Sequence, residues 1–389
     1  MRVFMLVSRV PWPLEKGDKL RAYHHLKELS KKHEVFLCCL SDGKVHPEAL
    51  PHLLEITPHV QIIQLNKLLI GIQLFLGLFS KKPFQVHYFF QRFAAKKIVG
   101  IIKKFNPHHI YCQLIRTTEY VKHLHEYPKT IDYMDALSAG QRRRFDVSSF
   151  WMKPLIQEEA SRLAAYENLI FDYFDHHTII SEQDKNLIYH EQRSKIVIVP
   201  NGVDQVYFSP SSVEKKYDLV FTGNMNYPPN IDCAIRIVKE ILPIVHQTHP
   251  NINLLIAGAN PHGRLLQLKS NHVQVSGWLN DIRTAYNESR IFIAPMRIGS
   301  GLQNKLLEAM SMNLPSITTP LAAKPMNAIH QENILIGNSN QDIAMLIIEL
   351  LKNPEEAKKI AARGRQFVAE NFDWSNTVGI LEKTISSPQ

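Results

Sequence analysis

The chain has 389 residues, of which 45% are hydrophobic and 21% are charged, and its formal net charge is +9. The composition excludes a disordered or fibrous chain, and the length is too great for a single hydrophobic core, so two domains are expected. The cysteines have no metal-binding spacing, which argues against a zinc module and a disulfide framework and favours a reducing compartment; they are Cys38, Cys39, Cys112 and Cys233.

The first half of the chain alternates between short apolar runs and helical patterns. The run that begins at Val3 is too short for a signal peptide and predicts a buried first strand. Strands separated by helices predict parallel βαβ units. The predicted strands are Val3–Val7, Val35–Leu40, Val60–Leu65, His109–Cys112, Thr130–Tyr133 and His177–Ile180, and the predicted helices are Lys19–Lys31, Ala94–Phe105 and Phe150–Phe174.

The stretch Leu68–Phe79 is strongly apolar but shorter than the roughly 20 residues that a membrane-spanning helix needs. Residues 1–199 carry 28 Lys and Arg against 20 Asp and Glu, whereas residues 200–389 carry 17 against 16. An apolar helix in a basic half predicts docking on an anionic membrane surface, and a core helix with solvated charges is the alternative. The expected location is cytoplasmic, with peripheral binding to the inner face of the membrane. The scattered basic residues form no recognised motif for nucleic acid.

The second half repeats the alternation after a linker at Asn201–Lys215. Two domains of this kind in series are expected to bind ligands at the carboxyl ends of their strands. The predicted strands are Leu219–Thr222, Asn253–Ala257, Val273–Val275, Arg290–Ala294, Ser316–Thr318 and Ile334–Ile336. The predicted helices are Asn230–His246, Asn280–Glu288, Leu302–Met312, Gln341–Leu351, Pro354–Asn371 and the closing segment Trp374–Ser387.

The stretch between Arg290 and Met310 is the most informative. Its apolar run predicts a strand that ends at Pro295, and the turn Gly299-Ser300-Gly301 lets backbone N–H groups approach a ligand closely. The helix predicted from Leu302 onward would present its N-terminus to that ligand, which favours an anion.

Lys305 and Glu308 are three residues apart, so they share one face of this predicted helix. A cation followed by a carboxylate suits a ligand that carries phosphates next to sugar hydroxyls, as a nucleotide-sugar does. The alternative is a solvent-exposed ion pair on an ordinary strand–turn–helix unit.

The segment that starts at Glu308 reads EAMSMNLPSITT. It resembles the helix and following strand of the group 1, or family 4, glycosyltransferases of GT-B fold. Other segments resemble that family in the same order, and together they cover roughly residues 196–380: Ile196–Asp204, Leu219–Met225, Leu254–Gly258 and Val275–Leu279. The N-terminal stretch Arg9–Arg21 resembles, more loosely, a sugar-transferase branch linked to bacterial exopolysaccharide loci.

The resemblance implies a GT-B fold, in which two Rossmann-like α/β domains with parallel sheets face a central cleft. It implies an acceptor-side domain at residues 1–200, a nucleotide-sugar-binding domain at 201–373, and a closing segment at 374–389 that crosses back to the first domain. The implied function is transfer of a sugar from a nucleotide-sugar to a saccharide or lipid-linked acceptor, with retention of configuration, in envelope or exopolysaccharide synthesis. Neither a metal nor another cofactor is expected.

Two departures from the family pattern concern the donor. Ser300 stands eight residues before Glu308, where the family has a glutamate that is expected to contact the donor sugar. The loop that begins with Gly223 and Asn224 is expected on the phosphate side, yet it lacks the Arg and Lys that the family often has there.

The diphosphate is therefore assigned to Arg297 and Lys305, because its departure leaves negative charge that must be stabilised. The backbone N–H groups of Gly301 and Leu302 are expected to add dipoles. Glu308 is assigned to the ribose, because an ionised carboxylate accepts two hydrogen bonds from a diol.

Asp135 is the candidate catalytic residue. It follows the predicted strand Thr130–Tyr133 and should lie at the carboxyl end of that strand, where the resemblance implies a histidine or aspartate close to the reacting sugar. It is expected to position the acceptor hydroxyl or to stabilise positive charge at the sugar carbon, and a helix N-cap is the alternative. Gly17 is expected to let the first loop approach the donor, with an ordinary turn glycine as the alternative.

Two other functions stay open at this point. A nucleotide-sugar 2-epimerase can share the two-domain scaffold, and it would turn over the donor without an acceptor. Ser300 in place of a glutamate also leaves room for a sugar-nucleotide binder that does not catalyse transfer.

Overall fold

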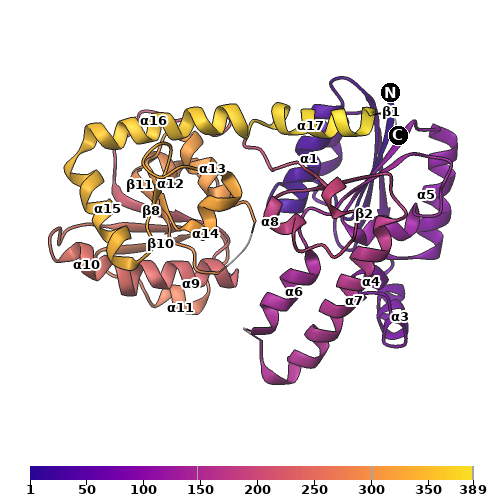
Figure 1. The fold of residues 1–389 in the computed structure, drawn as a ribbon, viewed down its shortest axis with the longest axis horizontal. Coiled ribbons are helices and arrows are strands. Elements are labelled where there is room, and N and C mark those ends of the chain that lie inside the picture. Colours follow the sequence, from indigo (N-terminus) through magenta and orange to yellow (C-terminus); the bar gives the residue numbers. More distant parts are fainter. Residues whose placement is uncertain (147, 299–300, 388–389) are drawn as a thin grey trace. The chain divides into compact units, whose positions relative to one another are not determined.

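The computed structural model describes residues 1–146, 148–298 and 301–387. The chain forms two compact units, of which one comprises Met1–Pro200 with the chain from Thr377 onward and the other comprises Asn201–Asn376. Each unit contains one parallel sheet with helices packed on it (Figure 1). The two-domain α/β fold expected from the sequence is therefore confirmed.

The first unit has a seven-stranded sheet in the order β3-β2-β1-β4-β5-β6-β7, and all neighbouring strands are parallel. Residues Val3–Val7 are fully buried, as a continuous apolar run in the centre of a parallel sheet should be. The last strand has two residues, too few to show a strand pattern in the sequence. The strands are β1 (Arg2–Val7), β2 (Glu34–Ser41), β3 (His59–Gln64), β4 (His109–Gln113), β5 (Lys129–Asp132), β6 (His176–Ile179) and β7 (Val197–Ile198).

The predicted helix at Phe150–Phe174 divides into a 3-10 turn and a longer α-helix, with Pro154 in the first turn of the latter, where proline is tolerated. One face of the sheet packs on α5 and α7, since Phe4 and Leu6 join Ile98 and Leu163 in one core cluster. The helices are α1 (Gly17–Leu29), α2 (Ala49–Leu54), α3 (Lys67–Gly77), α4 (Phe84–Phe89), α5 (Arg92–Phe105), η1 (Ile115–Tyr120), α6 (Leu137–Asp146), η2 (Phe150–Met152), α7 (Lys153–Phe171), α8 (Glu182–Lys185) and η3 (Arg193–Lys195).

Helix α3 is the apolar run singled out in the sequence. Asn66 caps its N-terminus, where the side chain accepts a hydrogen bond from the Leu68 N–H at 2.9 Å. Leu68 is 80% exposed and Phe75 is 61% exposed, so α3 is not the core helix that the alternative interpretation expected. Among the described residues, none of the helices combines the length and the apolar character that crossing a bilayer requires.

The second unit has a six-stranded parallel sheet in the order β10-β9-β8-β11-β12-β13. Its strands are β8 (Tyr217–Thr222), β9 (Leu254–Ala257), β10 (Val273–Gly277), β11 (Ser289–Ala294), β12 (Ser316–Thr318) and β13 (Leu335–Ile336). Its helices are α9 (Pro228–Arg236), the π-helical η4 (Ile237–Ile241), α10 (Leu242–His246), α11 (Gly263–Leu266), α12 (Arg283–Asn287), α13 (Asn304–Ser311), α14 (Pro320–Ala323), η5 (Lys324–Met326), α15 (Asn340–Lys352) and α16 (Pro354–Asn371), and α17 (Trp374–Ser386) begins here and continues into the first unit.

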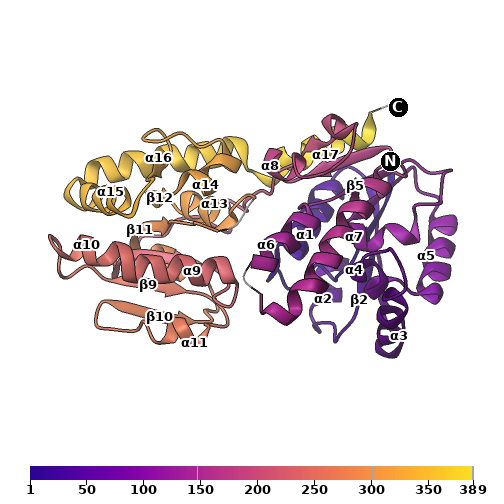
Figure 2. The ribbon, with the colours of Figure 1, turned by 60° about the horizontal axis from the view of Figure 1, so that its bottom comes forward.

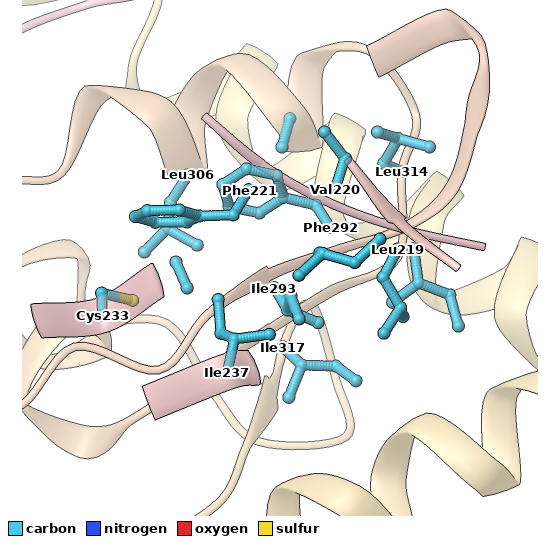
Figure 3. Packing of buried hydrophobic residues seen from close by; sticks show 14 of the residues in the cluster. Leu219, Val220, Phe221, Cys233, Ile237, Phe292, Ile293, Leu306, Leu314 and Ile317 are labelled. Carbon is cyan, nitrogen blue, oxygen red and sulfur yellow. The ribbon is translucent and has the colours of Figure 1, made fainter. Parts of the chain in front are cut away.

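Helices cover both faces of this second sheet, with α9 and α10 on one side and α13 and α16 on the other (Figures 1 and 2). In the core, Phe221 of β8 lies beside Leu306 of α13, and Ile293 of β11 lies near Ile237 of η4 (Figure 3). The chain moves from β8 outward to β9 and β10 and then returns to β11 on the other side of β8. Connections that leave adjacent strands in opposite directions open a crevice at their carboxyl ends, and β8 and β11 form that switch point.

Candidate functional site

The loop after β8 folds back tightly on α9. Gly223 follows the last residue of β8 with a φ of +152°, a conformation that favours glycine. A Cβ atom at this position would lie 2.7 Å from Nδ2 of Asn230. Asn230, in the first turn of α9, donates a hydrogen bond from Nδ2 to the backbone oxygen of Asn224 at 2.9 Å. The conformation of Gly223 thus lets Asn230 hold the predicted phosphate-side loop in place.

Lys305 reaches this loop from α13, the helix that follows β11. Its Nζ donates a hydrogen bond to Oδ1 of Asn230 and lies 4.9 Å from the centroid of the Phe221 ring. The side chain is half-buried, and burial lowers the pKa of its ammonium group to about 8. The partner of this cation is a neutral amide, which a phosphate can replace.

Glu308 lies one turn further along α13. Its Oε2 accepts a hydrogen bond from the Tyr286 hydroxyl at 2.7 Å, and that hydroxyl lies 2.8 Å from Oγ1 of Thr222. Since Tyr286 gives its proton to the carboxylate, Thr222 donates to Tyr286. Burial raises the pKa of Glu308 above its usual range, while the Tyr286 hydrogen bond and nearby Lys305 lower it in part. Sequence reasoning missed Tyr286 and Thr222, because their positions carry no motif.

The start of α13 differs from the prediction. The helix begins at Asn304 rather than Leu302, because Gln303 has an extended backbone with φ −93° and ψ 97°. Gly301 has a φ of +79°, and its carbonyl oxygen accepts a hydrogen bond from Nε2 of Gln303 at 3.3 Å. Leu302 therefore lies in the turn before the helix. Ser300, and with it the proposed substitution of a family glutamate, lies outside the described residues.

Arg297 forms ion pairs with two carboxylates. Its guanidinium contacts Oδ1 of Asp232 at 3.2 Å and Oε2 of Glu240 at 3.0 Å, and its side chain is 41% exposed. These ion pairs offset its charge. They also raise the pKa of the guanidinium group, and the hydrogen bond to Asp232 contributes most to that increase. Lys305 is thus better placed than Arg297 to meet a phosphate, and the role assigned to Arg297 stays a prediction.

In the first unit, Asp135 follows β5 by three residues and is exposed. The N-terminus of α6 is capped by other residues: Glu167 of α7 accepts hydrogen bonds from the Ser138 N–H at 3.1 Å and the Ser138 hydroxyl at 2.6 Å, and Asp184 accepts one from the Ala136 N–H. The N-cap alternative for Asp135 is therefore not what the structure shows. The pKa of Asp135 is raised to about 7, chiefly because nearby protein atoms desolvate its carboxyl group and secondly because the Asp184 carboxylate is close to it.

A buried charged network, which sequence reasoning missed, lies beneath this end of the sheet. Asp132 at the end of β5 receives two hydrogen bonds from the Arg21 guanidinium of α1, at 2.6 Å and 3.0 Å, and both side chains are fully buried. Tyr111 and Thr178 also donate to the Asp132 carboxylate, at 2.8 Å and 3.0 Å. The network ties α1 to β4, β5 and β6 and leaves Asp132 fully coordinated by protein groups.

Gly17 is the first residue of α1, and a Cβ atom built there would meet nothing within 4 Å. The local fold thus does not require a glycine at this position. Gly17 and Asp135 belong to the first unit, whereas the donor-side residues belong to the second. The predicted roles of both residues toward the donor and acceptor stay predictions.

Residues 216–353 match the family model described as glycosyl transferases group 1. This range runs from the start of β8 to the end of α15, so it contains Gly223, Asn230, Tyr286, Lys305 and Glu308. Most of the second unit is therefore similar to the group 1 glycosyl transferases. The coarser part of the resemblance is confirmed, whereas the exopolysaccharide branch stays a prediction.

Two curated relatives align with part of the chain. An uncharacterized 44.6 kDa protein in the cps region of Klebsiella pneumoniae is 29% identical over 54% of this chain and 57% of its own length. A GDP-mannose-dependent monoacylated alpha-(1-6)-phosphatidylinositol monomannoside mannosyltransferase of Corynebacterium glutamicum is 28% identical over 45% of this chain and 52% of its own length. The chain thus spans a little over half the length of these relatives.

Among solved structures, HepE of Anabaena in complex with UDP-glucose superposes with a TM-score of 0.65 at 14% identity, covering 99% of this chain and 100% of that chain. At this identity the likeness concerns the fold alone. The likeness covers the first unit as well as the second, so the chain as a whole has the two-domain GT-B fold.

Proposed function

We propose that this chain transfers a sugar from a nucleotide-sugar to a saccharide or lipid-linked acceptor, in envelope or exopolysaccharide synthesis. The observation that carries the proposal is the position of Lys305 and Glu308 on one face of α13, beside the switch point of β8 and β11, within the residues that match the group 1 family model. Similar proteins support it: the HepE complex holds UDP-glucose, one relative is a GDP-mannose-dependent mannosyltransferase, and another lies in a cps region.

In the donor complex, Glu308 accepts hydrogen bonds from the ribose diol, and the Tyr286 hydroxyl fixes the orientation of its carboxylate. Lys305 exchanges its neutral Asn230 partner for the diphosphate oxygens. The loop at Gly223 and Asn224 supplies the opposite wall of the phosphate site. This division of roles lets the carboxylate hold the nucleoside while the cation meets the group that departs.

In the transfer step, the bond between the sugar carbon and the diphosphate oxygen breaks, and the electron pair leaves with the diphosphate. Lys305 and the backbone N–H groups of Gly301 and Leu302 stabilise that charge, so the reaction proceeds without a metal. Asp135 positions the acceptor hydroxyl, whose oxygen forms the new glycosidic bond with retention of configuration while its proton passes to the departing diphosphate oxygen. At pH values below about 7 the Asp135 carboxyl becomes protonated, which weakens its ability to accept a hydrogen bond from the acceptor.

The first unit is also proposed to bind the membrane surface that carries a lipid-linked acceptor. Helix α3 exposes large apolar side chains, Leu68 and Phe75 among them, and Lys81 and Lys82 follow it closely. This combination suits peripheral contact with an anionic bilayer.

A thermal-shift screen of UDP-, GDP- and ADP-sugars tests donor binding. We expect one nucleotide class to stabilise the protein and Glu308→Ala to abolish most of that stabilisation, because a hydrogen bond to a charged group contributes about 1.5–3 kcal/mol. Glu349→Ala, at an exposed position of α15, is the matched control and should behave like the unsubstituted chain. An equal shift in both variants would contradict the ribose role of Glu308.

Product analysis separates transfer from the rival functions. Loss of donor only in the presence of an acceptor supports the proposal, whereas epimerised donor formed without an acceptor identifies a 2-epimerase. Donor stabilisation with no turnover across an acceptor panel identifies a binder.

A further inference from the structure

Two pockets adjoin each other in the first unit, and they differ in chemistry. The polar pocket has a volume of about 280 Å³ and offers Arg9, Asp42, Gln85, Tyr88 and Arg116. The apolar groove has a volume of about 480 Å³ and is lined chiefly by Leu74, Phe75, Leu78, Met152, Leu155 and Ile156. Leu74 and Phe84 line both, so the two pockets are immediate neighbours.

The polar pocket presents both donors and acceptors around a nearly balanced set of charges. The Tyr88 hydroxyl donates to Oδ2 of Asp42 at 2.7 Å, and the Arg116 guanidinium donates to Oε1 of Gln85 at 2.9 Å and 2.6 Å. Asp18, which does not line the pocket, pairs with Arg9 and lies 3.9 Å from Arg116. Asp42 in the lining and Asp18 outside it together offset the charges of the two guanidinium groups, which suits an uncharged polyhydroxyl group better than an anion.

An aromatic wall completes this pocket. The Arg116 guanidinium lies 5.5 Å from the centroid of the Phe89 ring, and Phe84 and Phe89 both face the pocket. A few convergent polar groups beside apolar and aromatic side chains are what a small-molecule site requires, and a sugar ring presents polar edges together with apolar faces. The chemistry of the polar pocket is therefore that of a saccharide site.

The apolar groove is held open by polar contacts between its walls. Glu159 of α7 accepts hydrogen bonds from the Phe84 and Gln85 N–H groups at the start of α4, at 2.7 Å and 3.1 Å. Arg162 of α7 donates to the Gly77 oxygen at the end of α3 at 2.6 Å. These contacts fix α3, α4 and α7 next to one another (Figure 1) and leave apolar side chains between them.

Those side chains remain exposed. Phe75 is 61% exposed, Leu78 is 54% exposed and Leu155 is 47% exposed. A contiguous exposed apolar surface is typical of a binding site, because contact between such a surface and water is unfavourable. Apart from Gln141, Arg144 and Glu159, the last of which is engaged by α4, the groove offers no polar partner among the described residues that line it. A hydrocarbon chain fits this surface.

We propose that the acceptor is a glycolipid, whose sugar head group enters the polar pocket while its hydrocarbon chain lies in the apolar groove. The inference rests on the proposed glycosyl transfer and names the acceptor class for it. Its basis is that the two pockets adjoin each other at Leu74 and Phe84 and that each pocket matches one end of such a molecule.

Binding of dodecyl maltoside below its micelle concentration tests the proposal by calorimetry, with maltose and dodecyl tetraethylene glycol ether as partial ligands. We expect dodecyl maltoside to bind most tightly, since it fills both pockets. Leu78→Ser should weaken that binding about tenfold, which is about 1.4 kcal/mol, because the serine removes apolar surface that the hydrocarbon chain would bury. Leu68→Ser is the matched control, since Leu68 lies on α3 outside the groove and is 80% exposed.

The head-group pocket is tested by Asp42→Asn. This change should remove the preference for dodecyl maltoside over the tetraethylene glycol ether and leave the binding of the latter unchanged, because only the sugar uses the Asp42 carboxylate. Equal losses in Leu78→Ser and Leu68→Ser would overturn the proposal in favour of a general membrane-binding face. Concentration-dependent dimerisation that Leu78→Ser abolishes would assign the groove to a second copy of the chain.

The same variants separate this inference from the proposed function. Alkyl glycoside binding without stabilisation by any nucleotide-sugar would contradict glycosyl transfer while leaving a glycolipid site. Stabilisation by a nucleotide-sugar with no difference between dodecyl maltoside and maltose would overturn the glycolipid acceptor and leave the donor site intact.

Discussion

Each unit places an acidic and a basic residue near the carboxyl ends of its strands, yet the two pairs differ in how they are satisfied. In the first unit, Arg21 and Asp132 bind each other directly and are fully buried. In the second, Lys305 contacts Asn230 and Glu308 contacts Tyr286, so each charged group has a neutral partner. A buried pair with its hydrogen bonds filled holds the fold, whereas half-buried charges with neutral partners remain able to bind a charged or hydroxylated ligand.

The largest effect is expected from breaking the buried pair. Asp132→Ala leaves the Arg21 guanidinium without its carboxylate in the core, which should cost about 3–5 kcal/mol of the unfolding free energy of the first unit. Urea unfolding measures this loss. Glu308→Gln, which keeps a hydrogen bond acceptor for Tyr286, should cost less than about 1 kcal/mol. Similar losses for the two variants would erase the contrast between the pairs.

A second test concerns the glycine that lets Asn230 hold the donor loop. Gly223→Ala should cost about 1–3 kcal/mol, because φ is +152° and the new Cβ would lie 2.7 Å from Nδ2 of Asn230. Gly263→Ala is the control in the same unit, since a Cβ there meets nothing within 4 Å. Nucleotide-sugar binding should weaken in Gly223→Ala alone. Unchanged stability would show that the loop relaxes easily and does not preorganise the site.

The charge of Lys305 can be tested through pH. Its pKa lies at about 8, so the ammonium form predominates below that pH and is lost above it. Affinity for a nucleoside diphosphate should therefore fall as pH rises above 8, by at most about tenfold per pH unit, while affinity for the nucleoside changes little. Titration calorimetry at pH 7 and pH 9 measures both. Parallel profiles for the two ligands, or an unchanged profile in Lys305→Ala, would exclude Lys305 as the phosphate cation.

The smallest effect on folding is expected at Gly17. Gly17→Ala should change the unfolding free energy by less than about 0.5 kcal/mol, because the added Cβ meets no other atom. A loss of donor affinity in this variant would then report a contact with the ligand itself. Unchanged affinity in a stable variant would remove Gly17 from the donor site and leave it an ordinary glycine at a helix start.

Much of the fold was predictable because buried parallel strands are continuous apolar runs bounded by polar turns. Val3–Val7, Arg290–Ala294 and Ser316–Thr318 all lie within or on observed strands. The sequence was less informative where local backbone detail decides the boundary. The extended conformation of Gln303 moves the start of α13 to Asn304, and a π-helical segment interrupts the predicted helix Asn230–His246.

The candidate site was predictable in part, because Lys305 and Glu308 follow a recognisable strand, turn and helix along the chain. Their partners were not. Asn230 is 75 residues from Lys305, and Tyr286 lies on a different helix from Glu308, so no local pattern links them. The exposure of α3 could not be predicted either, because an apolar helix in the core and an apolar helix that binds a ligand have the same sequence pattern.

The sequence alone determined the alternation of strands and helices, the two-domain fold class and the order of the family motifs, because these depend on residues that are close together in the chain. Only the tertiary structure decided how the charges are satisfied. Arg21 and Asp132 are separated by 111 residues, yet they meet in the core, where a charge without a partner is costly. The free-energy cost of an unpaired buried charge keeps Arg21 and Asp132 together. Lys305 and Glu308 are only half-buried, so this cost is smaller for them, and they have partners that a ligand can replace.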